Sequence, residues 1–269
     1  MNTRCLFYSL TAQNASEDNI TLCPLLDYAN HSFSAPDVNT AGLRERGYPI
    51  PTFLSPPDLT LEQGEQVFLR YGSHSRCELL TEYSFVDMGG PIEVSVDDLI
   101  EELFENAEDG SERRKLLECH GYWGFVQICC LLSKALLRTI SRDWTLHATG
   151  ASVHPSYRLL PPLRLLHLRL SDKSQLKRFE ATIDGYEEII SPENDMKMRE
   201  SLVGICERLT SRADTGLRAL DDFVGEADLK LDALGFDLLQ SLKFIRWLWE
   251  EELDVANKMQ QHIERGGEI

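Results

Sequence analysis

Two short segments carry residue types that could do chemistry. In the first, Asp27-Tyr-Ala-Asn-His-Ser32, the carboxyl of Asp27 and the imidazole of His31 lie four positions apart. On a helix they would share a face and could bind a metal ion or form an acid–base pair, but metal sites usually take more ligands and no third one is near. Asn-His-Ser after an apolar run is equally typical of a turn whose side chains bond the local backbone. The residue types alone favour that structural interpretation.

The second segment ends in a tyrosine. In Gln66–Arg70, apolar Val67 and Leu69 alternate with polar neighbours, which predicts a β-strand and places Tyr71 where that strand leaves its sheet. A phenol has a reference pKa of about 10, so it stays protonated at neutral pH and can orient an amine rather than act as a strong base. A strand-end aromatic that only packs on a neighbour is the commoner alternative, and it stays open here.

Both segments belong to a region that differs in composition from the rest of the chain. Up to about residue 90 the sequence is rich in proline and glycine, with short apolar runs between these turn formers. One such run, Tyr48–Leu54, is typical of a strand that its prolines would confine to a sheet edge. After Gly89-Gly90 the pattern becomes helical, so we expect two domains, residues 1–90 and residues 91–269.

The second region shows the signals that start and stop helices. Ser95 is expected to cap a first helix and Ser111 a second one. The apolar stretch Phe125–Ile140 is long enough for a core helix, and Trp144–Gly150 predicts a short strand or an extended loop. The pair Pro161-Pro162 must start, kink or end any helix near it.

Three long helical patterns follow Ser171, and the last is the clearest. Its apolar residues step by three or four positions: Leu238, Leu242, Ile245, Trp249, Leu253 and Ala256. This spacing predicts one apolar stripe on a helix whose other face is charged.

The overall charge bears on the choice of partner. With 27 Lys and Arg against 44 Asp and Glu the formal net charge is −17, which disfavours nucleic acid because a phosphate backbone requires clustered basic residues. A negative field favours a cationic partner, although acidity that only maintains solubility explains the composition equally well. We find no signal peptide, no membrane-spanning stretch and no zinc spacing among the seven cysteines. These features predict reduced, buried thiols and a location in the cytoplasm or nucleus.

Three ordered segments together resemble a known family. The turn at Asn30-His-Ser32 comes first, then the strand Gly64-Glu-Gln-Val-Phe-Leu-Arg-Tyr-Gly72, then Glu78-Leu-Leu-Thr-Glu-Tyr-Ser-Phe-Val86. This order resembles the SET domain of the Rubisco large-subunit lysine methyltransferase and its relatives. The resemblance continues more loosely into the helical region, at Pro155–Leu166.

The resemblance implies an α+β fold in two parts. Residues 1–90 would be a small mixed β remnant, the C-terminal part of a SET domain. Residues 91–269 would be an all-α helical domain similar to the substrate-binding domain of that methyltransferase.

The resemblance also implies a cofactor, S-adenosylmethionine, and residues that hold it. Asn30 would bind it through its side chain and His31 largely through its backbone at the adenine, while Asp27 would brace the turn. Arg4 would contact the carboxylate end of the cofactor through a charge-assisted bond. No metal ion is implied.

Three aromatic residues would form the rest of the implied site. Tyr71 would be the catalytic group, with its hydroxyl in the channel that joins the cofactor and lysine sites, and Tyr83 and Phe85 would line that channel and the adenine pocket. A neutral lysine amine would attack the sulfonium methyl in line, so positioning supplies much of the rate, and desolvation favours the deprotonated amine. The implied partner is a basic, lysine-containing protein, such as a ribosomal protein, a histone or another intracellular protein.

The sequence departs from the family pattern in two places. Ser84 stands where the family has glycine, a change that matters only if this backbone needs a positive φ. The family's Gly-x-Gly turn, which cradles the methionine part of the cofactor, has no counterpart upstream of Asn30. The resemblance therefore implies a protein-lysine N-methyltransferase that is impaired or inactive in this chain and binds the cofactor poorly. The alternative is a non-catalytic helical protein-binding module or a pseudoenzyme fragment.

Overall fold

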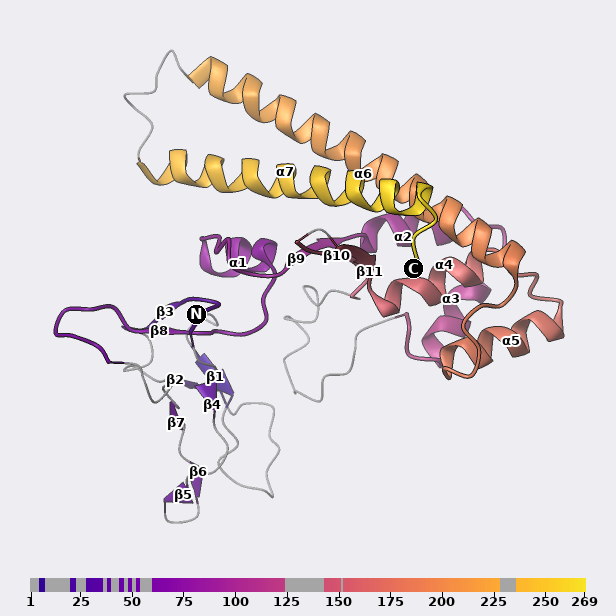
Figure 1. Cartoon of the computed structure of the whole chain (residues 1–269), viewed down its shortest axis with the longest axis horizontal. Coiled ribbons are helices and arrows are strands. Elements are labelled where there is room, and N and C mark those ends of the chain that lie inside the picture. Colours follow the sequence, from indigo (N-terminus) through magenta and orange to yellow (C-terminus); the bar gives the residue numbers. More distant parts are fainter. Residues whose placement is uncertain are drawn as a thin grey trace. The chain divides into compact units, whose positions relative to one another are not determined.

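The structure is a computed structural model of residues 1–269, and it describes residues 5–7, 20–22, 28–35, 38–39, 44–45, 48–49, 52–53, 60–123, 143–150, 152–227 and 236–269. Among these, the residues up to Pro91 form one compact unit and those from Ile92 form another (Figure 1). Expectations that concern Arg4, Asp27 and the helix over Phe125–Ile140 fall outside the described residues.

The first unit is built from short paired strands and one helix. Its antiparallel pairs are β1 (Cys5–Phe7) with β2 (Ile20–Leu22), β4 (Val38–Asn39) with β7 (Thr52–Phe53), and β5 (Arg44–Glu45) with β6 (Tyr48–Pro49). A fourth pair, β3 (Asn30–His31) with β8 (Phe68–Leu69), is parallel. Short parallel pairing joins segments far apart in sequence, and here it sets the turn at Asn30 beside the strand that leads to Tyr71.

Two strand expectations in this unit need correction. Tyr48–Leu54 is not one edge strand, because β6 and β7 pair with different partners; its prolines remove backbone donors that a single ladder would require. The strand before Tyr71 is shorter than predicted, and only Leu69 is buried, at 6% exposure, whereas Val67 is 47% exposed. Val67 precedes the paired residues and therefore lies outside the pleat that turns Leu69 inward.

Helix α1 (Arg76–Tyr83) begins with a reciprocal cap. The Ser75 hydroxyl accepts from the Glu78 backbone N–H, and the Glu78 carboxylate accepts from the Ser75 backbone N–H at 2.7 Å. Two of the N–H groups that a helix start leaves unpaired are thereby satisfied. The helix packs Leu79 inward with no exposed surface, so α1 is fixed both at its start and on its face.

The second unit begins with a three-stranded antiparallel sheet. Its order is β9 (Ile92–Ser95), β10 (Thr145–Thr149), β11 (Ser152–Pro155), with β10 in the centre. Leu146 and Ala148 point into the core, because side chains alternate along a strand. The α+β class is confirmed and the strand predicted at Trp144–Gly150 is present, but the expectation of an all-α domain over residues 91–269 is wrong in this respect.

Helices account for the rest of the second unit (Figure 1). They are α2 (Asp97–Glu105), α3 (Gly110–Cys119), α4 (Leu160–Leu166), α5 (Lys173–Ile183), α6 (Pro192–Ala227) and α7 (Phe236–Glu264), with a 3₁₀ turn at Tyr157–Leu159. The three long patterns after Ser171 are confirmed as α5, α6 and α7. Pro161-Pro162 starts α4, since proline is tolerated in a first turn whose N–H groups are unpaired in any case. Helices α6 and α7 pack against each other as an antiparallel pair.

The predicted caps of the first two helices are wrong by one or two residues. Ser95 ends β9, and the residue that caps α2 is Val96. The Ser95 hydroxyl still accepts from the Asp97 backbone N–H, at 3.4 Å. Helix α3 starts at Gly110, which places Ser111 inside its first turn. Strand pairing through Ser95 overrides the local preference of serine for a cap.

One continuous apolar core holds the second unit together. Its fully buried members come from the sheet and from most of the helices, and they include Leu146, Leu163, Phe179, Leu202 and Met259. The stripe predicted on α7 is buried only near its end, where Ala256 has no exposed surface. Leu238 is 39% exposed and Ile245 is 37% exposed.

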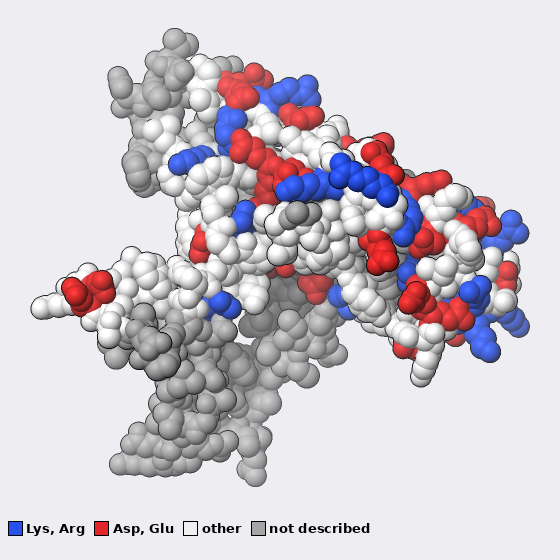
Figure 2. Space-filling model, in the orientation of Figure 1, with Lys and Arg blue, Asp and Glu red and all other residues white. Residues whose placement is uncertain are grey.

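The surface of the second unit carries both signs of charge. Figure 2 shows Asp and Glu side chains interspersed with Lys and Arg on the face in view, rather than one continuous acidic field. Within the described ranges no helix combines the length and apolar character needed to cross a bilayer. Three described cysteines are free; Cys206 is buried as expected, whereas Cys77 and Cys119 are exposed.

Candidate functional site

The backbone of β3 is paired on one edge. The Asn30 N–H donates to the Val67 carbonyl at 3.0 Å and the Ser32 N–H donates to the Leu69 carbonyl at 3.1 Å. Backbone groups alternate in direction along a strand, so the N–H and C=O of His31, between these two, face the opposite edge. Within the part of the chain that the structure describes, no strand pairs with β3 on that edge. His31 therefore presents one donor and one acceptor side by side.

The ring of His31 lies beneath this backbone, with no exposed side-chain surface. Its Nδ1 accepts from the Tyr71 backbone N–H at 3.1 Å, which assigns the proton of the neutral ring to Nε2. That Nε2 lies 3.8 Å from Asp87 Oδ2. Burial lowers the pKa of His31, against a smaller upward effect of Asp87. His31 is thus a neutral brace between three segments and not a base.

The phenol of Tyr71 points back to the same turn. Its hydroxyl donates to the Ala29 carbonyl at 2.7 Å. Its ring lies 5.2 Å from the His31 ring and 5.1 Å from the Tyr83 ring, centroid to centroid. Phe85 closes the group, at 5.8 Å from His31 and 6.2 Å from Tyr83. The structure therefore brings His31, Tyr71, Tyr83 and Phe85 together as one aromatic cluster.

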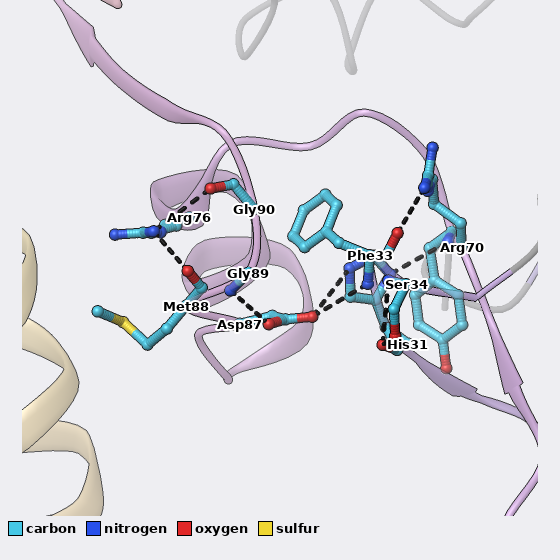
Figure 3. Close-up of polar contacts among 11 residues, drawn as sticks. His31, Phe33, Ser34, Arg70, Arg76, Asp87, Met88, Gly89 and Gly90 are labelled. Atoms are coloured by element: carbon cyan, nitrogen blue, oxygen red, sulfur yellow. Dashed lines mark hydrogen bonds and ion pairs between the residues drawn. The ribbon is translucent and has the colours of Figure 1, made fainter. Parts of the chain in front are cut away.

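Asp87 ties the turn after β3 to the segment after α1 (Figure 3). Its Oδ2 accepts from the Phe33 backbone N–H at 3.2 Å, and its Oδ1 accepts from the Gly89 N–H at 2.8 Å. Arg70 donates to the carbonyl of the same Phe33. A Cβ added at Gly90 would lie 2.1 Å from the Phe33 ring, so only glycine allows this close approach.

A buried arginine anchors the same segment to α1. The Arg76 guanidinium donates to the Met88 carbonyl at 2.6 Å and to the Gly90 carbonyl at 3.3 Å, and the residue is 8% exposed (Figure 3). Hydrogen bonds from a charged donor to buried carbonyls are among the stronger ones in proteins. Together with Asp87, Arg76 fixes the chain that leaves the aromatic cluster.

Ser84 ends α1 in the left-handed conformation, with φ 64°. This is the position where the family pattern has glycine. The replacement of glycine by serine matters here, because the backbone has a positive φ. A non-glycine residue there is strained by about 1–2 kcal/mol. The turn from Tyr83 to Phe85 keeps its shape despite that strain.

The predicted site residues thus have different outcomes. His31, Tyr71, Tyr83 and Phe85 lie together, whereas Asn30 is exposed on β3. Among the described residues, no group of three His, Cys, Asp or Glu side chains could hold a metal ion. The possibility that Asp27 and His31 form a metal site or an acid–base pair is not tested, because Asp27 lies outside the described residues.

Two residues of the site were missed by sequence reasoning. Asp87 precedes Met-Gly-Gly, and aspartate before glycine signals a turn in which its carboxylate bonds the backbone two residues on. That signal could have located the Gly89 contact but not the one to Phe33, which is 54 positions away. Arg76 gave no local signal, because its acceptors are carbonyls that any residue supplies.

Comparison with known proteins places the chain in a family. Residues 98–246 match the family described as Rubisco LSMT substrate-binding. This match covers more than half of the chain, and the chain belongs to that family. The matched residues lie in the second unit, where the sheet and the helical core are found.

Curated relatives extend the similarity. The ribosomal lysine N-methyltransferase set11 of Schizosaccharomyces pombe is 36% identical over 141 residues, 52% of this chain and 32% of that protein. Ribosomal lysine N-methyltransferase 2 of Saccharomyces cerevisiae is 27% identical over 78% of this chain and 40% of its own length. SET domain-containing protein 4 of Mus musculus is 27% identical over 82% of this chain and 45% of its own length. The chain spans less than half the length of these relatives.

Solved structures align with the chain at low identity. The SET domain of LSMT bound to lysine and AdoHcy aligns with a TM-score of 0.49 and 18% identity, over 98% of this chain and 53% of that one. Rubisco LSMT bound to sinefungin and monomethyllysine aligns with a TM-score of 0.45 and 18% identity, over 97% of this chain and 52% of that one.

Proposed function

We propose that the chain is part of a protein-lysine N-methyltransferase that uses S-adenosylmethionine. The observation that carries the proposal is the convergence, on the turn at Ala29–His31, of the Tyr71 hydroxyl and a His31 backbone edge that no described strand pairs with. The curated relatives, which are named as lysine methyltransferases or as a SET-domain protein, support it. The second unit would recognise the protein substrate, in line with the family it belongs to.

The described residues fit the cofactor in two respects. The outward N–H and C=O of His31 match the acceptor and donor that an adenine edge offers side by side. The faces of Tyr71 and Tyr83 suit a sulfonium cation, because aromatic rings attract positive charge. When bound, the cofactor supplies an electrophilic methyl group.

The chemistry left to the protein is to place an amine. Because the Tyr71 hydroxyl donates its proton to the Ala29 carbonyl, it is the Tyr71 oxygen, as an acceptor, that would take an N–H of a neutral lysine amine. The amine lone pair is then left for the methyl group. Burial raises the pKa of Tyr83, with smaller contributions from Tyr71 and Glu82, so its phenol is neutral at physiological pH. Desolvation of the amine in the channel also favours its uncharged form.

The substrate class follows from the relatives and from the charge. Two of the curated relatives are named as ribosomal lysine methyltransferases, and the net charge of −17 favours a basic protein. We therefore propose a lysine in a basic protein, with ribosomal proteins as the first candidates and histones as the second.

A methyl-transfer assay tests this proposal. The protein, expressed with any in-frame sequence upstream of Met1, is incubated with tritiated S-adenosylmethionine and purified ribosomal proteins. Label should appear on lysine. Tyr71→Phe should lower the turnover about a hundredfold, since loss of one positioning contact in a reaction site has effects of this size. Tyr157→Phe, at an exposed position of the second unit, is the matched control.

We also propose that the 269 residues alone bind the cofactor weakly, because the sequence upstream of Asn30 contains no Gly-x-Gly turn. Isothermal titration with S-adenosylmethionine measures this. Micromolar affinity in the 269-residue chain contradicts the proposal of weak binding but leaves the methyl-transfer proposal intact.

A second candidate function is a non-catalytic protein-binding module. It is favoured by one observation, namely that the family match falls on the second unit alone. A protein that binds ribosomal proteins but transfers no methyl group, with or without Tyr71, would support the module over the enzyme.

A further inference from the structure

Helix α6 has two apolar faces. One is the core face, where Met198, Leu202 and Leu209 have no exposed surface. A surface helix that packs on one side normally carries polar residues elsewhere. In α6, however, a neighbouring face places Met196 and Val203 seven residues apart, beside a groove of about 600 Å³. The helix therefore offers apolar surface that its own core does not use.

The groove has an apolar floor made by three elements. Ile189 comes from the loop before α6, Met196 and Val203 from α6 itself, and Ile263 from the end of α7. Met196 is 53% exposed and Ile189 is 38% exposed. Large apolar side chains that gather beside a hollow are typical of surfaces that bind a partner.

Gly204 makes the middle of this groove unusual. It lies inside a 36-residue helix, where glycine is unfavourable relative to alanine. Gly216 on the same helix has a packing reason, because a Cβ there would lie 2.4 Å from Trp249. Gly204 has none among the described residues, since a Cβ there would meet no atom within 4 Å. Its effect is to leave the helix backbone open at the groove.

Two exposed carboxylates lie on the groove wall. The Arg199 guanidinium donates to the Asp195 carboxylate at 2.8 Å and to the Gly267 carbonyl at 2.7 Å. Glu200 and Glu207, by contrast, form no ion pair with any described residue and are both exposed. They lie about 10 Å apart along the helix axis, at 1.5 Å per residue. In an extended peptide, side chains two and four positions apart lie on one face, at about 3.3 Å per residue, and flexible basic side chains four positions apart can converge on carboxylates at this closer spacing.

We infer that this groove docks a basic protein segment in extended form, with an apolar side chain over Gly204 and two basic side chains, two positions before and two positions after it on the same face, at Glu200 and Glu207. Charge complementarity selects this occupant, because an acidic or neutral segment would leave both carboxylates without a partner. The inference concerns the second unit only and does not rest on methyl transfer.

Binding of a defined peptide tests the inference. The probe is a short fluorescein-labelled peptide with two lysines four positions apart and a leucine midway between them. Its binding to the 269-residue chain is followed by fluorescence anisotropy without cofactor. The double variant Glu200→Gln/Glu207→Gln should weaken binding about tenfold, the loss expected for two exposed ion pairs. Gly204→Leu should abolish binding, because the side chain fills the groove.

Two controls separate docking from other causes. Asp214→Asn/Asp222→Asn makes the same charge change at exposed positions of α6 outside the groove, and it should leave binding unchanged. Gly204→Leu should raise the melting temperature, because leucine is the better helix former and the space above it is open, so lost binding cannot be due to unfolding. Equal losses in the two double variants, binding that survives Gly204→Leu, or self-association of the chain that Gly204→Leu abolishes would each overturn the inference.

Discussion

Each of the two units is stabilised internally by a different kind of interaction. In the first, the buried apolar residues described are few, among them Ala29 and Leu69, and hydrogen bonds of Arg76 and Asp87 fix the chain. In the second, one apolar core runs through the sheet and the helices. Hydrophobic burial is non-directional, whereas a hydrogen bond depends on its geometry. The aromatic cluster thus lies in the unit whose shape depends on single polar groups.

The largest effect is expected in the apolar core of the second unit. Leu202→Ala should lower the free energy of unfolding by about 3 kcal/mol, because it leaves a cavity at a fully buried position. Leu239→Ala is the matched control, at a position that is 41% exposed. Chemical denaturation followed by circular dichroism measures both. Equal losses in the two variants would refute the picture of a continuous core.

In the first unit a polar substitution should act locally. Asp87→Asn should weaken its contacts with Phe33 and His31 by about 2 kcal/mol, the range of a hydrogen bond to a charged group. Amide hydrogen exchange should then accelerate at Phe33 and Tyr71. Asp184→Asn, an exposed position that follows α5, should change neither rate. Unchanged exchange at Phe33 would show that Asp87 does not hold the turn.

A smaller and opposite effect is expected at Ser84. Ser84→Gly should stabilise the first unit by about 1 kcal/mol, because glycine relieves the left-handed strain at φ 64°. Ser84→Ala keeps a Cβ and should give no such gain. Exchange rates in α1 report the change, and a gain from alanine equal to that from glycine would rule out backbone strain as the cause.

Acid is expected to affect the two units differently. Burial lowers the pKa of both His31 and His167, so each ring is neutral in the folded chain at neutral pH. The unfolded chain takes up protons at these residues below about pH 6.5, and the stability of the fold therefore decreases as the pH falls below that value. His167 bonds the Ser201 hydroxyl at 2.7 Å, and a hydroxyl can accept as well as donate. Protonated His31 would instead lose its bond from the Tyr71 N–H. Exchange at Tyr71 should therefore accelerate before that at Ser201 as pH falls; the reverse order would contradict this assignment.

Much of the second unit could be predicted from sequence because its signals are local. The helical periodicity after Ser171 and the proline pair at Pro161-Pro162 gave α4 to α7 directly. The sheet was harder, since β10 pairs with β9, about 50 positions earlier in the chain, and no local pattern encodes that register. The apolar stripe predicted on α7 is buried only near its end. Such a stripe predicts which face of a helix makes contact, but not how much of that face the neighbouring elements cover.

The candidate site was predictable as a set of segments but not as a geometry. Tyr71, Tyr83 and Phe85 followed from a resemblance of ordered motifs. The brace formed by Asp87 and Arg76 depends on carbonyl and N–H partners that no residue type reveals. The φ of Ser84 likewise appears only in the folded chain, although the glycine of the family pattern pointed to it.

The central claim is that the phenol of Tyr71 faces the methyl group of the bound donor. The protein, with any in-frame sequence upstream of Met1, can be mixed with S-adenosylmethionine labelled with ¹³C in its methyl group, and contacts from that methyl to aromatic protons can be recorded by isotope-filtered NMR. We predict contacts to the ring of Tyr71 that disappear in Tyr71→Ala. Contacts from the bound methyl group only to residues of the second unit would contradict the account.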